Sequence, residues 1–415
     1  MDVLLVTLGT AGDIHPFLAL GCELKRRNHR VTLVSNPYFK PWAERLGLGF
    51  YGFGSVEHFQ AVLADPDVWH PFRGFKVLVR ELFLGSMRPA FEAIDQVRSR
   101  ASVLLAPGYL YGARIAAEKF NLPLATVALQ PAALWSAENP VVLAPHSWSR
   151  FVPVWLRSLI VQGIDHLFLE GLLAPETNRF RRELGLPAVS RVATRWPYSP
   201  DLLIALFPEW FAPPPSDWPA HLVQTGFLSH ESFDTRPLAP ECEDFLARGE
   251  APILFTPGSG HCQAETFFQV ATAVCEKLGQ RGLFLTAFQG HLPKELPETI
   301  RHFDYLPFSR IFPRCKAVVH HGGIGTLSKG LAASVPQLIM PLAYDQPDNA
   351  RRIKHLGVGD WISPKHFNPI RVEEKLKSLI TSDAIRRQCR KIAPLIDTES
   401  ALADSCGLIE MLGTG

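Results

Sequence analysis

Glycine, histidine and acidic side chains gather between residues 317 and 359 in a spacing that suits an anionic ligand. The glycines at 322, 323 and 325 let backbone N–H groups approach a ligand closely. The helix expected after them adds unpaired N–H donors at its positive end. His320 ends the preceding strand, where it could hydrogen-bond a phosphate. The cluster therefore predicts an anion site, with an ordinary tight strand-to-helix turn as the alternative.

A second polar pair, Asp345 and Gln346, follows the strand predicted at residues 337–340. In open α/β sheets, ligands bind in the crevice outside the carboxyl ends of the strands, so this pair and the glycine turn are expected to face the same crevice. The segment contains neither GxxxxGKS/T nor GxGxxG. A P-loop triphosphatase is therefore disfavoured, and the dinucleotide-binding fingerprint is absent.

The elements that must position these residues follow one plan that occurs twice in the chain. Each copy has a strand, a glycine turn, a helix with apolar residues at helical spacing, and a second strand. Alternation of this kind builds a doubly wound parallel sheet, so we predict two α/β domains. The copies occupy residues 3–35 and 253–287, further strands are predicted at 103–106, 124–128, 317–320 and 337–340, and further helices at 111–120 and 324–333.

A proline-rich segment, PEWFAPPPSDWP at residues 208–219, separates the two halves, because three consecutive prolines prevent regular structure. We place the domain boundary shortly after it and divide the chain into residues 1–228 and 229–415. The C-terminal residues are helical and basic, and they are expected to close the second domain, with the last helix free to pack back on the first.

The composition is that of a globular protein. The chain has 415 residues, 47% of them hydrophobic and 20% charged, with a formal net charge of +2. This is too apolar for general disorder, and no basic field exists to hold a nucleic acid. The seven cysteines are scattered and form no CxxC pair, which argues against a zinc site or a disulfide scaffold.

The hydropathy pattern gives an expectation about location. The first residues lack the basic start and long apolar core of a signal peptide, and no stretch approaches about 18 uninterrupted apolar residues. We expect a cytoplasmic protein. Residues 152–172 form an amphipathic helix with Arg150 and Arg157 at one end. It is expected to pack on the first domain; a binding-site wall or a contact with the inner face of a membrane are the alternatives.

The HHGGIGT segment, followed by SVPQ and PLAYDQPDNA, resembles the donor-sugar signature of family 1 glycosyltransferases of the GT-B fold. The resemblance extends to LGTAGDIHPFLALGCELKRRNHRVTLV, FAPPPSDWP and FTPGSG, so it covers essentially the whole chain. It implies two Rossmann-like domains facing each other across a cleft. Within the family, these segments and DPDVW at residues 65–69 are most similar to the rhamnosyltransferases of rhamnolipid biosynthesis.

The resemblance implies a nucleoside-diphosphate sugar, linked to dTDP or UDP, as co-substrate, with no further cofactor and no metal ion. Asp65-Pro66-Asp67 spells DxD, but it lies away from the donor segment and is interpreted as a loop. For Tyr305, which the resemblance places at the nucleotide base, the alternative is an aromatic residue of the core. For Asp345, which it places at the sugar, the alternative is a solvated acid in a loop. The implied donor contacts are Gly12 and Ser259 in the glycine turns, His320, Gly322, Gly323, Ile324, Gly325 and Thr326 at the diphosphate, Tyr305 and the Leu306 backbone at the base, and Asp345 and Gln346 at the sugar hydroxyls.

The resemblance also implies a general base in the first glycine turn. An inverting glycosyltransferase needs a base that removes the acceptor hydroxyl proton as the oxygen attacks the anomeric carbon. Asp13 in GDIHP stands where plant members carry a histidine, and it is the predicted base, although an N-cap role is a compatible alternative. An apolar setting that raises its pKa would help it. His15 is predicted either to tune Asp13 or to cap the helix, and residues 103–112 contain no partner carboxylate.

The acceptor is expected to contact aromatic residues of the first domain such as Phe72, Phe83 and Trp135, although ordinary core packing explains any one of them. Our best prediction is transfer of L-rhamnosyl from dTDP-L-rhamnose to a hydroxyl of a 3-hydroxyalkanoyl lipid. The alternatives are a UDP-glucose-dependent transfer to a sterol or natural product, a nucleotide-sugar epimerase, and a non-catalytic helper protein of the same fold. A helper has no need of both halves of the site. The sequence leaves open whether the protein needs a membrane-associated partner.

Overall fold

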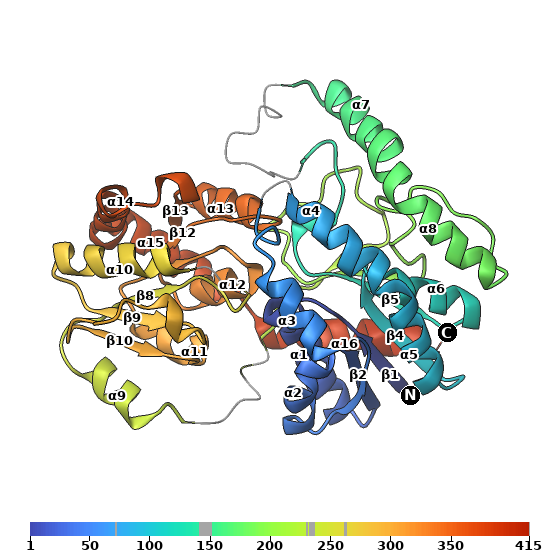
Figure 1. The fold of residues 1–415 in the computed structure, drawn as a ribbon, viewed down its shortest axis with the longest axis horizontal. Coiled ribbons are helices and arrows are strands. Elements are labelled where there is room, and N and C mark those ends of the chain that lie inside the picture. Colours follow the sequence, from blue (N-terminus) through green and yellow to red (C-terminus); the bar gives the residue numbers. More distant parts are fainter. Residues whose placement is uncertain (71–72, 141–151, 230, 232–236, 261–263, 415) are drawn as a thin grey trace.

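Two parallel sheets form the framework of the protein, in a computed structural model that describes residues 1–70, 73–140, 152–229, 231, 237–260 and 264–414 (Figure 1). The first sheet has the strand order β3-β2-β1-β4-β5-β6-β7 and the second has the order β10-β9-β8-β11-β12-β13. The predicted fold class is confirmed. The strands are β1 Asp2–Val6, β2 Arg30–Ser35, β3 Gly49–Gly52, β4 Ser102–Pro107, β5 Leu124–Ala128, β6 Leu202–Ala205, β7 Leu222–Gln224, β8 Ile253–Thr256, β9 Gly282–Leu285, β10 Ile300–Phe303, β11 Ala317–His320, β12 Gln337–Ile339 and β13 Gly359–Trp361.

Both sheets reverse their strand order once, between β1 and β4 in the first and between β8 and β11 in the second. Ligands of open α/β sheets bind at such switch points, beyond the carboxyl ends of the strands. The loops that leave these four strands therefore define the region in which a site must be sought.

Helices cover both faces of each sheet (Figure 1). The inner strands, such as β1, β4, β5, β8 and β11, are short and almost wholly apolar because both of their faces are buried, whereas the edge strands are partly exposed. Apolar clusters occupy the space between helices and sheets. The helices are α1 Ala11–Arg26, α2 Lys40–Arg45, α3 Val56–Ala64, α4 Arg73–Val77, α5 Met87–Val97, α6 Tyr111–Phe120, α7 Val154–Ile164, α8 Glu170–Glu183, α9 Pro240–Ala247, α10 Glu265–Leu278, α11 Phe308–Ile311, α12 Ile324–Ala332, α13 Gln346–His355, α14 Pro369–Thr381, α15 Asp383–Ile392 and α16 Thr398–Thr414.

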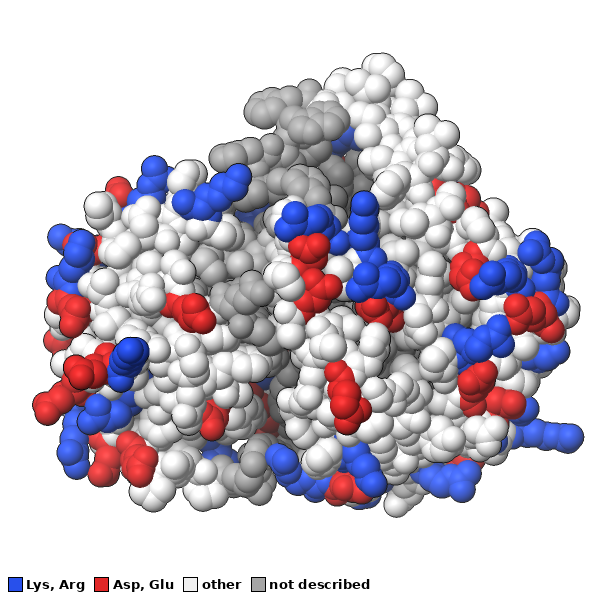
Figure 2. Space-filling model, viewed as in Figure 1, with Lys and Arg blue, Asp and Glu red and all other residues white. Residues whose placement is uncertain are grey.

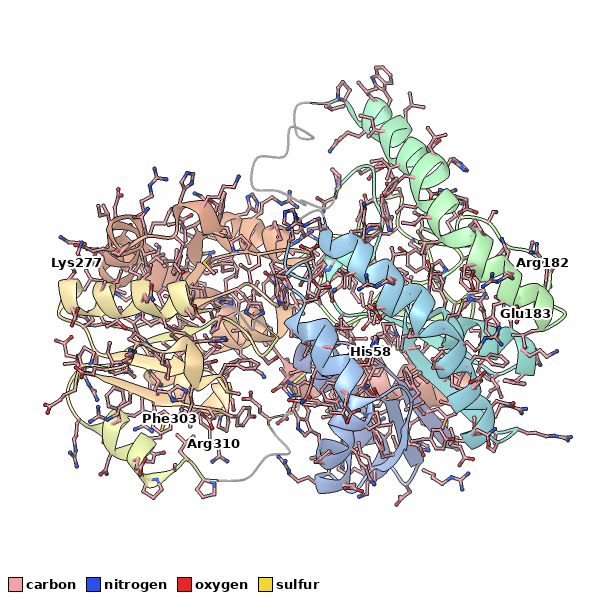
Figure 3. The ribbon with its side chains drawn as sticks, in the orientation of Figure 1. His58, Arg182, Glu183, Lys277, Phe303 and Arg310 are labelled. Atoms are coloured by element: carbon pink, nitrogen blue, oxygen red, sulfur yellow. The ribbon has the colours of Figure 1, made fainter. Side chains whose placement is uncertain are left out.

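The amphipathic helix predicted at 152–172 is longer in the structure. It runs from α7 through a π-helical segment, Asp165–Leu169, into α8 and ends at Glu183. Pro175 lies inside α8 without ending it. Arg182 and Glu183 mark the far end of this arm, on the outer rim of the first domain (Figure 3). The apolar spacing does not predict the last part of this helix, because polar residues replace the apolar stripe there.

The last helix, α16, lies against the first domain. Leu402, Cys406 and Ile409 are buried in the same apolar cluster as residues of α1. Glu410 accepts hydrogen bonds from Arg27 at 2.9 Å and from His29 at 2.8 Å. The C-terminal segment therefore ties the two domains together after the second sheet is complete (Figure 1).

Charged side chains of both signs are interspersed over the face seen in Figure 2. This agrees with the small net charge of the chain. Among the helices that the structure describes, none is long and apolar enough to cross a membrane.

Candidate functional site

A cavity of about 1860 Å³ lies between the two domains, where the loops after β1, β4, β8 and β11 meet. Many of the sequence-predicted residues line it, from both halves of the chain. From the first domain these are Gly12, Asp13, His15, Phe83 and Trp135; from the second they are Ser259, Tyr305, Leu306, Gly323, Ile324, Gly325, Thr326, Asp345 and Gln346.

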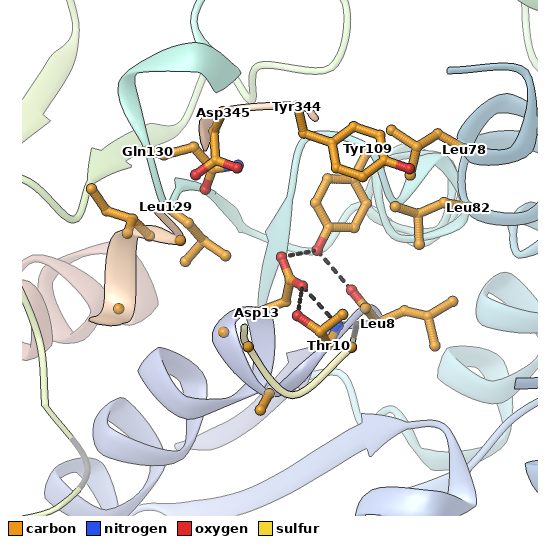
Figure 4. A pocket seen from close by; sticks show the side chains of 18 of the residues that line it. Leu8, Thr10, Asp13, Leu78, Leu82, Tyr109, Leu129, Gln130, Tyr344 and Asp345 are labelled. Carbon is orange, nitrogen blue, oxygen red and sulfur yellow. Dashed lines mark hydrogen bonds between the residues drawn. The ribbon is translucent and has the colours of Figure 1, made fainter. Parts of the chain in front are cut away.

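Asp13 lies at the start of α1 with its carboxylate held by three hydrogen bonds (Figure 4). Oδ2 accepts the Thr10 backbone N–H at 2.8 Å and the Thr10 hydroxyl at 3.2 Å. Oδ1 accepts the Tyr109 hydroxyl at 3.4 Å. The cap of α1 is therefore Thr10, and Asp13 is the third helical residue that reaches back to it. The alternative in which Asp13 itself is the N-cap is therefore wrong.

The surroundings of Asp13 suit a base. Burial raises the pKa of its carboxyl, because a low-dielectric setting disfavours the charged form, while the bonds from Thr10 and Tyr109 act in the opposite direction. A carboxylate with a raised pKa holds a proton more strongly than an exposed one, so it is a better proton acceptor near neutral pH. His15 lines the same cavity and stacks on Trp42, with ring centroids 5.0 Å apart.

Tyr109 is a site residue that the sequence reading missed. It follows β4 at the switch point of the first sheet, and its hydroxyl also contacts the Leu8 carbonyl at 2.7 Å (Figure 4). Residues 103–112 contain no carboxylate, but the phenol of Tyr109 can also hold an acid in place. Phe83 packs 6.4 Å from the Tyr109 ring and lines the cavity.

Gly9 is required by this arrangement. Its φ is +133°, and a Cβ there would collide with the Asp13 carboxylate. We expect Gly9→Ala to lower the transfer activity that the sequence predicts for Asp13 about tenfold or more and to destabilise the fold by roughly 1–3 kcal/mol. Activity and thermal unfolding measure the two effects. Gly185→Ala is the matched control, because Gly185 also has a positive φ, +73°, with nothing near its Cβ position. Equal activities of the two variants would contradict this role.

The structure corrects the assignment of His320. Its side chain is fully buried at the end of β11 and does not line the cavity. Nε2 lies 2.9 Å from the Gln337 Oε1 atom, and Nδ1 accepts the Gly322 N–H at 3.1 Å. Burial lowers its pKa to about 4, so the ring is neutral. His320 therefore braces the glycine turn from inside the domain rather than facing a phosphate.

His321, the next residue, lines the cavity. Its ring is enclosed by two glycines, since a Cβ at Gly258 would lie 2.6 Å from its Cε1 atom and one at Gly323 would also meet the ring. Gly258 has φ +96° and belongs to the turn after β8. The two glycine turns of the second domain thus meet around His321.

The turn after β11 aims backbone groups at the cavity. Gly323 precedes the first residue of α12, and Ile324, Gly325 and Thr326 form the first helical turn. The Thr326 N–H donates to the Gly323 carbonyl at 3.1 Å, which leaves the N–H groups of Ile324 and Gly325 as the natural partners of an anion. Gly322 does not line the cavity, contrary to its assignment. With φ +97°, it shapes the turn, and a Cβ there would meet Ile339.

Asp345 and Gln346 lie at the start of α13 and face the cavity from the second domain. The side-chain oxygen of Gln346, Oε1, accepts the backbone N–H of Leu342 at 2.8 Å and holds the loop that precedes α13. Asp345 accepts a 2.7 Å bond from Asn349. Burial, followed by the charge of Asp13 across the cavity, raises the Asp345 pKa to about 7. The two carboxylates therefore share one space (Figure 4).

This raised pKa makes folding stability depend on pH. Between about pH 4 and pH 7 the folded protein binds more protons at Asp345 than the unfolded chain does, so stability falls as the pH rises. We expect Asp345→Asn to stabilise the ligand-free protein at pH 8 by on the order of 2 kcal/mol, with a smaller gain at pH 5. Thermal unfolding at both values measures this, with Asp244→Asn on the surface of α9 as the control. A destabilised variant at pH 8 would contradict it.

The residues predicted to contact the nucleotide base lie in the second domain, and those predicted to contact the acceptor belong to the first. Tyr305 lines the cavity and is 50% exposed, so it is not a core aromatic. Leu306 is buried beside it. Trp135 lines the first-domain wall, whereas Phe72 lies outside the described residues. The wall also includes Leu78 and Leu82 of the π-helical segment after α4 (Figure 4).

The arm formed by α7 and α8 completes this wall. Ile160, Val161 and Ile164 line the cavity, and Leu173 is buried in the first-domain core. Trp155 remains 65% exposed. The arm therefore packs on the first domain and also forms a side of the cavity.

The DxD segment is a turn. Asp65 ends α3, and its Oδ1 accepts the Asp67 N–H at 2.9 Å, while Asp67 pairs with Arg73 at 2.7 Å. Within the described ranges, no group of three or more His, Cys, Asp or Glu side chains is arranged to hold a metal ion.

Comparisons with known proteins agree with this architecture. Residues 3–134 match the glycosyltransferase family 28 N-terminal domain, and residues 283–403 match the erythromycin biosynthesis protein CIII-like C-terminal domain. The chain is 28% identical to O-mycaminosyltylonolide 6-deoxyallosyltransferase of Streptomyces fradiae, over 99% of this chain and 97% of that protein. The solved structure of the calicheamicin glycosyltransferase CalG4 has the same fold, with a TM-score of 0.73 and 19% identity over 99% of this chain and 98% of that one.

Several relatives are similar enough to define the family. One of them is an uncharacterized glycosyltransferase of Mycobacterium bovis, 32% identical over 86% of this chain and 86% of that protein. The protein described here therefore belongs to the glycosyltransferases and is an enzyme of the two-domain GT-B fold.

Proposed function

We propose that the protein transfers a hexosyl group from a nucleoside-diphosphate sugar to a hydroxyl of an apolar acceptor, with inversion at the anomeric carbon. The observation that carries this proposal is the pair of carboxylates from opposite domains in one cavity. Asp13 is held by Thr10 and Tyr109 on the acceptor side, and Asp345 lies beside the glycine turn on the donor side.

The reaction follows from this placement. Asp13 takes the proton of the acceptor hydroxyl as its oxygen forms a bond to the anomeric carbon. The bond from that carbon to the diphosphate oxygen breaks, and the electron pair leaves with the nucleoside diphosphate. The N–H groups at the start of α12 and the His321 ring stabilise the developing charge, so no metal ion is required in this scheme.

The other cavity residues bind the donor in this proposal. Ser259 and Thr326 add hydroxyl groups to the diphosphate site, and Asp345 with Gln346 holds the sugar hydroxyls. Tyr305 stacks on the base beside the Leu306 backbone. Because these groups come from the second domain and Asp13 from the first, closure of the cleft assembles the complete site.

The apolar wall favours a lipophilic acceptor. Leucine, phenylalanine and tryptophan side chains surround the space in front of Asp13, including Leu82, Phe83 and Trp135. We propose a 3-hydroxyalkanoyl lipid that receives L-rhamnosyl from dTDP-L-rhamnose, at the inner face of a membrane or in the cytoplasm. The S. fradiae relative, whose name specifies transfer to O-mycaminosyltylonolide, supports a natural-product acceptor as the second candidate.

Product analysis by mass spectrometry separates these candidates. The purified protein is given dTDP-L-rhamnose and UDP-glucose together, with a 3-hydroxyalkanoyl lipid, a sterol and a macrocyclic natural product as competing acceptors. Each product has its own mass. A rhamnosylated lipid is expected. A glucosylated sterol or natural product would change the proposed donor and acceptor and leave the proposed roles of the site residues as they are. No product from any pair would favour the helper function or a missing partner protein.

A further inference from the structure

The loop at residues 65–70 of the first domain contacts two loops of the second domain. One is the glycine turn after β8, which contains Gly260, and the other is the loop before α13, which contains Tyr344. The indole N–H of Trp69 donates to the Gly260 carbonyl at 2.9 Å. The Tyr344 hydroxyl donates to the Val68 carbonyl. The rings of Trp69 and Tyr344 meet edge to face, with centroids 5.7 Å apart. Trp69 and Tyr344 both line the cavity.

The two acids of the DxD segment give this loop its shape. Asp65 accepts the Asp67 N–H at 2.9 Å, and the Asp65 carbonyl accepts the Val68 N–H at 3.0 Å. Arg73 at the start of α4 pairs with Asp67, and Arg80 lies 3.8 Å from Asp65. The carboxylates therefore fix a turn that projects the Val68 carbonyl and the Trp69 ring toward the second domain.

Two glycines allow the close approach. A Cβ at Gly74 would lie 2.5 Å from the Val68 carbonyl oxygen and 3.0 Å from the Tyr344 hydroxyl. A Cβ at Gly260 would lie 3.1 Å from both the Thr10 methyl group and the Trp69 ring. Thr10 is the residue that holds Asp13. The loop thus joins the support of the predicted base to the second domain.

Each partner in the second domain is next to a predicted donor contact. Gly260 follows Ser259, and Tyr344 precedes Asp345. Tyr344 has φ +62°, a left-handed conformation that is uncommon for a tyrosine and that the surrounding contacts must hold in place. Its hydroxyl is bonded to the first domain, so release of that bond leaves the strained residue beside Asp345 free to relax.

We propose that Trp69 and Tyr344 form an interdomain latch, whose engagement places Asp345 and the Ser259 turn opposite Asp13. They act as positioning residues for the transfer reaction, and this part of the proposal rests on the proposed function. The DxD sequence serves the latch as a turn-forming element and has no metal to bind in this role.

The first test needs no substrate. Hydrogen exchange of backbone amides is compared between the wild-type protein and the variants Trp69→Phe and Tyr344→Phe, each of which removes one donor group. Tyr344→Phe keeps the six-membered ring, and Trp69→Phe replaces the indole with a smaller aromatic ring. We expect exchange at residues 258–260 and 343–346 to become about tenfold faster, as loss of one interdomain hydrogen bond would give. Trp210→Phe and Tyr51→Phe are the controls, since both side chains pack in cores outside the cavity. Unchanged exchange in both latch variants overturns the proposal.

The second test asks whether Tyr344 acts through Asp345. Transfer rates are measured for Tyr344→Phe, Asp345→Asn and the double variant. We expect Tyr344→Phe to lower kcat about tenfold in the wild-type background and less than twofold beside Asp345→Asn. Additive losses overturn the positioning role. Absence of transfer by the wild-type protein is a failure of the proposed function, and the exchange experiment then decides the latch by itself.

Discussion

Replacing Asp13 with asparagine is expected to lower glycosyl transfer by about a thousandfold. The amide has nearly the same shape and still accepts the Thr10 N–H, but it cannot take the proton of the acceptor hydroxyl. General-base catalysis typically contributes 10²–10⁴-fold, roughly the size of the expected loss. Single-turnover rates with saturating donor and acceptor measure the chemical step without the effect of product release.

Donor binding separates this loss from misfolding. Asp13 belongs to the first domain, whereas the predicted donor contacts other than Gly12 belong to the second, so calorimetric titration with dTDP or UDP is expected to give nearly unchanged affinity. Asp95→Asn on the exposed side of α5 is the matched control and is expected to retain full transfer. Transfer by Asp13→Asn within tenfold of the wild-type rate would remove Asp13 from the proposed mechanism.

The fold was accessible to sequence reasoning because its strands carry a strong local signal. The strands β8 and β11 occur where the apolar runs ILFT and AVVH predicted them, each followed by a glycine turn. Strands buried on both faces read as continuous apolar runs, and glycines mark their ends. The switch points then follow from the topology, which is why the sequence predicts that Asp345 and Gln346 face the crevice. Asp13 is predicted from the family resemblance instead.

The parts that sequence reasoning missed depend on contacts between distant residues. Trp69 and Gly260 are 191 positions apart, and no local pattern pairs them. Tyr109 supports Asp13 through a phenol, whereas the family pattern suggests a second acid. The continuation of the α7 arm to Glu183 depends on Phe180 and Arg181, which are buried against the first domain. Such information lies in the packed structure and not in spacing.

His320 and His321 are adjacent in the sequence but have different roles, because one side chain is buried and the other lines the cavity. Successive side chains at a strand end point to opposite sides, so one of two adjacent histidines turns inward and the other outward. The sequence HHGG does not say which. A glutamine at 337 on the neighbouring strand was the available signal, because a buried histidine needs a polar partner and Gln337 supplies it.

Replacing His321 with alanine is therefore expected to weaken binding of a nucleoside diphosphate by roughly 10- to 100-fold, as loss of a charge-assisted hydrogen bond to a phosphate would. The fold should remain intact, because the ring faces the cavity. Calorimetric titration with dTDP and UDP measures the affinity, and thermal unfolding measures the stability.

His320→Ala supplies the opposite expectation and makes the pair decisive. Removing this ring leaves the Gln337 amide and the Gly322 N–H buried without their partner, which costs about 1–3 kcal/mol of stability. Nucleoside diphosphate binding by the folded fraction should change less than threefold, because this ring braces the turn from behind. If His320→Ala loses the ligand and His321→Ala keeps it, the donor site is built on the first histidine and the assignment made from the structure is wrong. If both lose it, the brace and the contact are one unit, and the turn between β11 and α12 must be treated as a single phosphate-binding element.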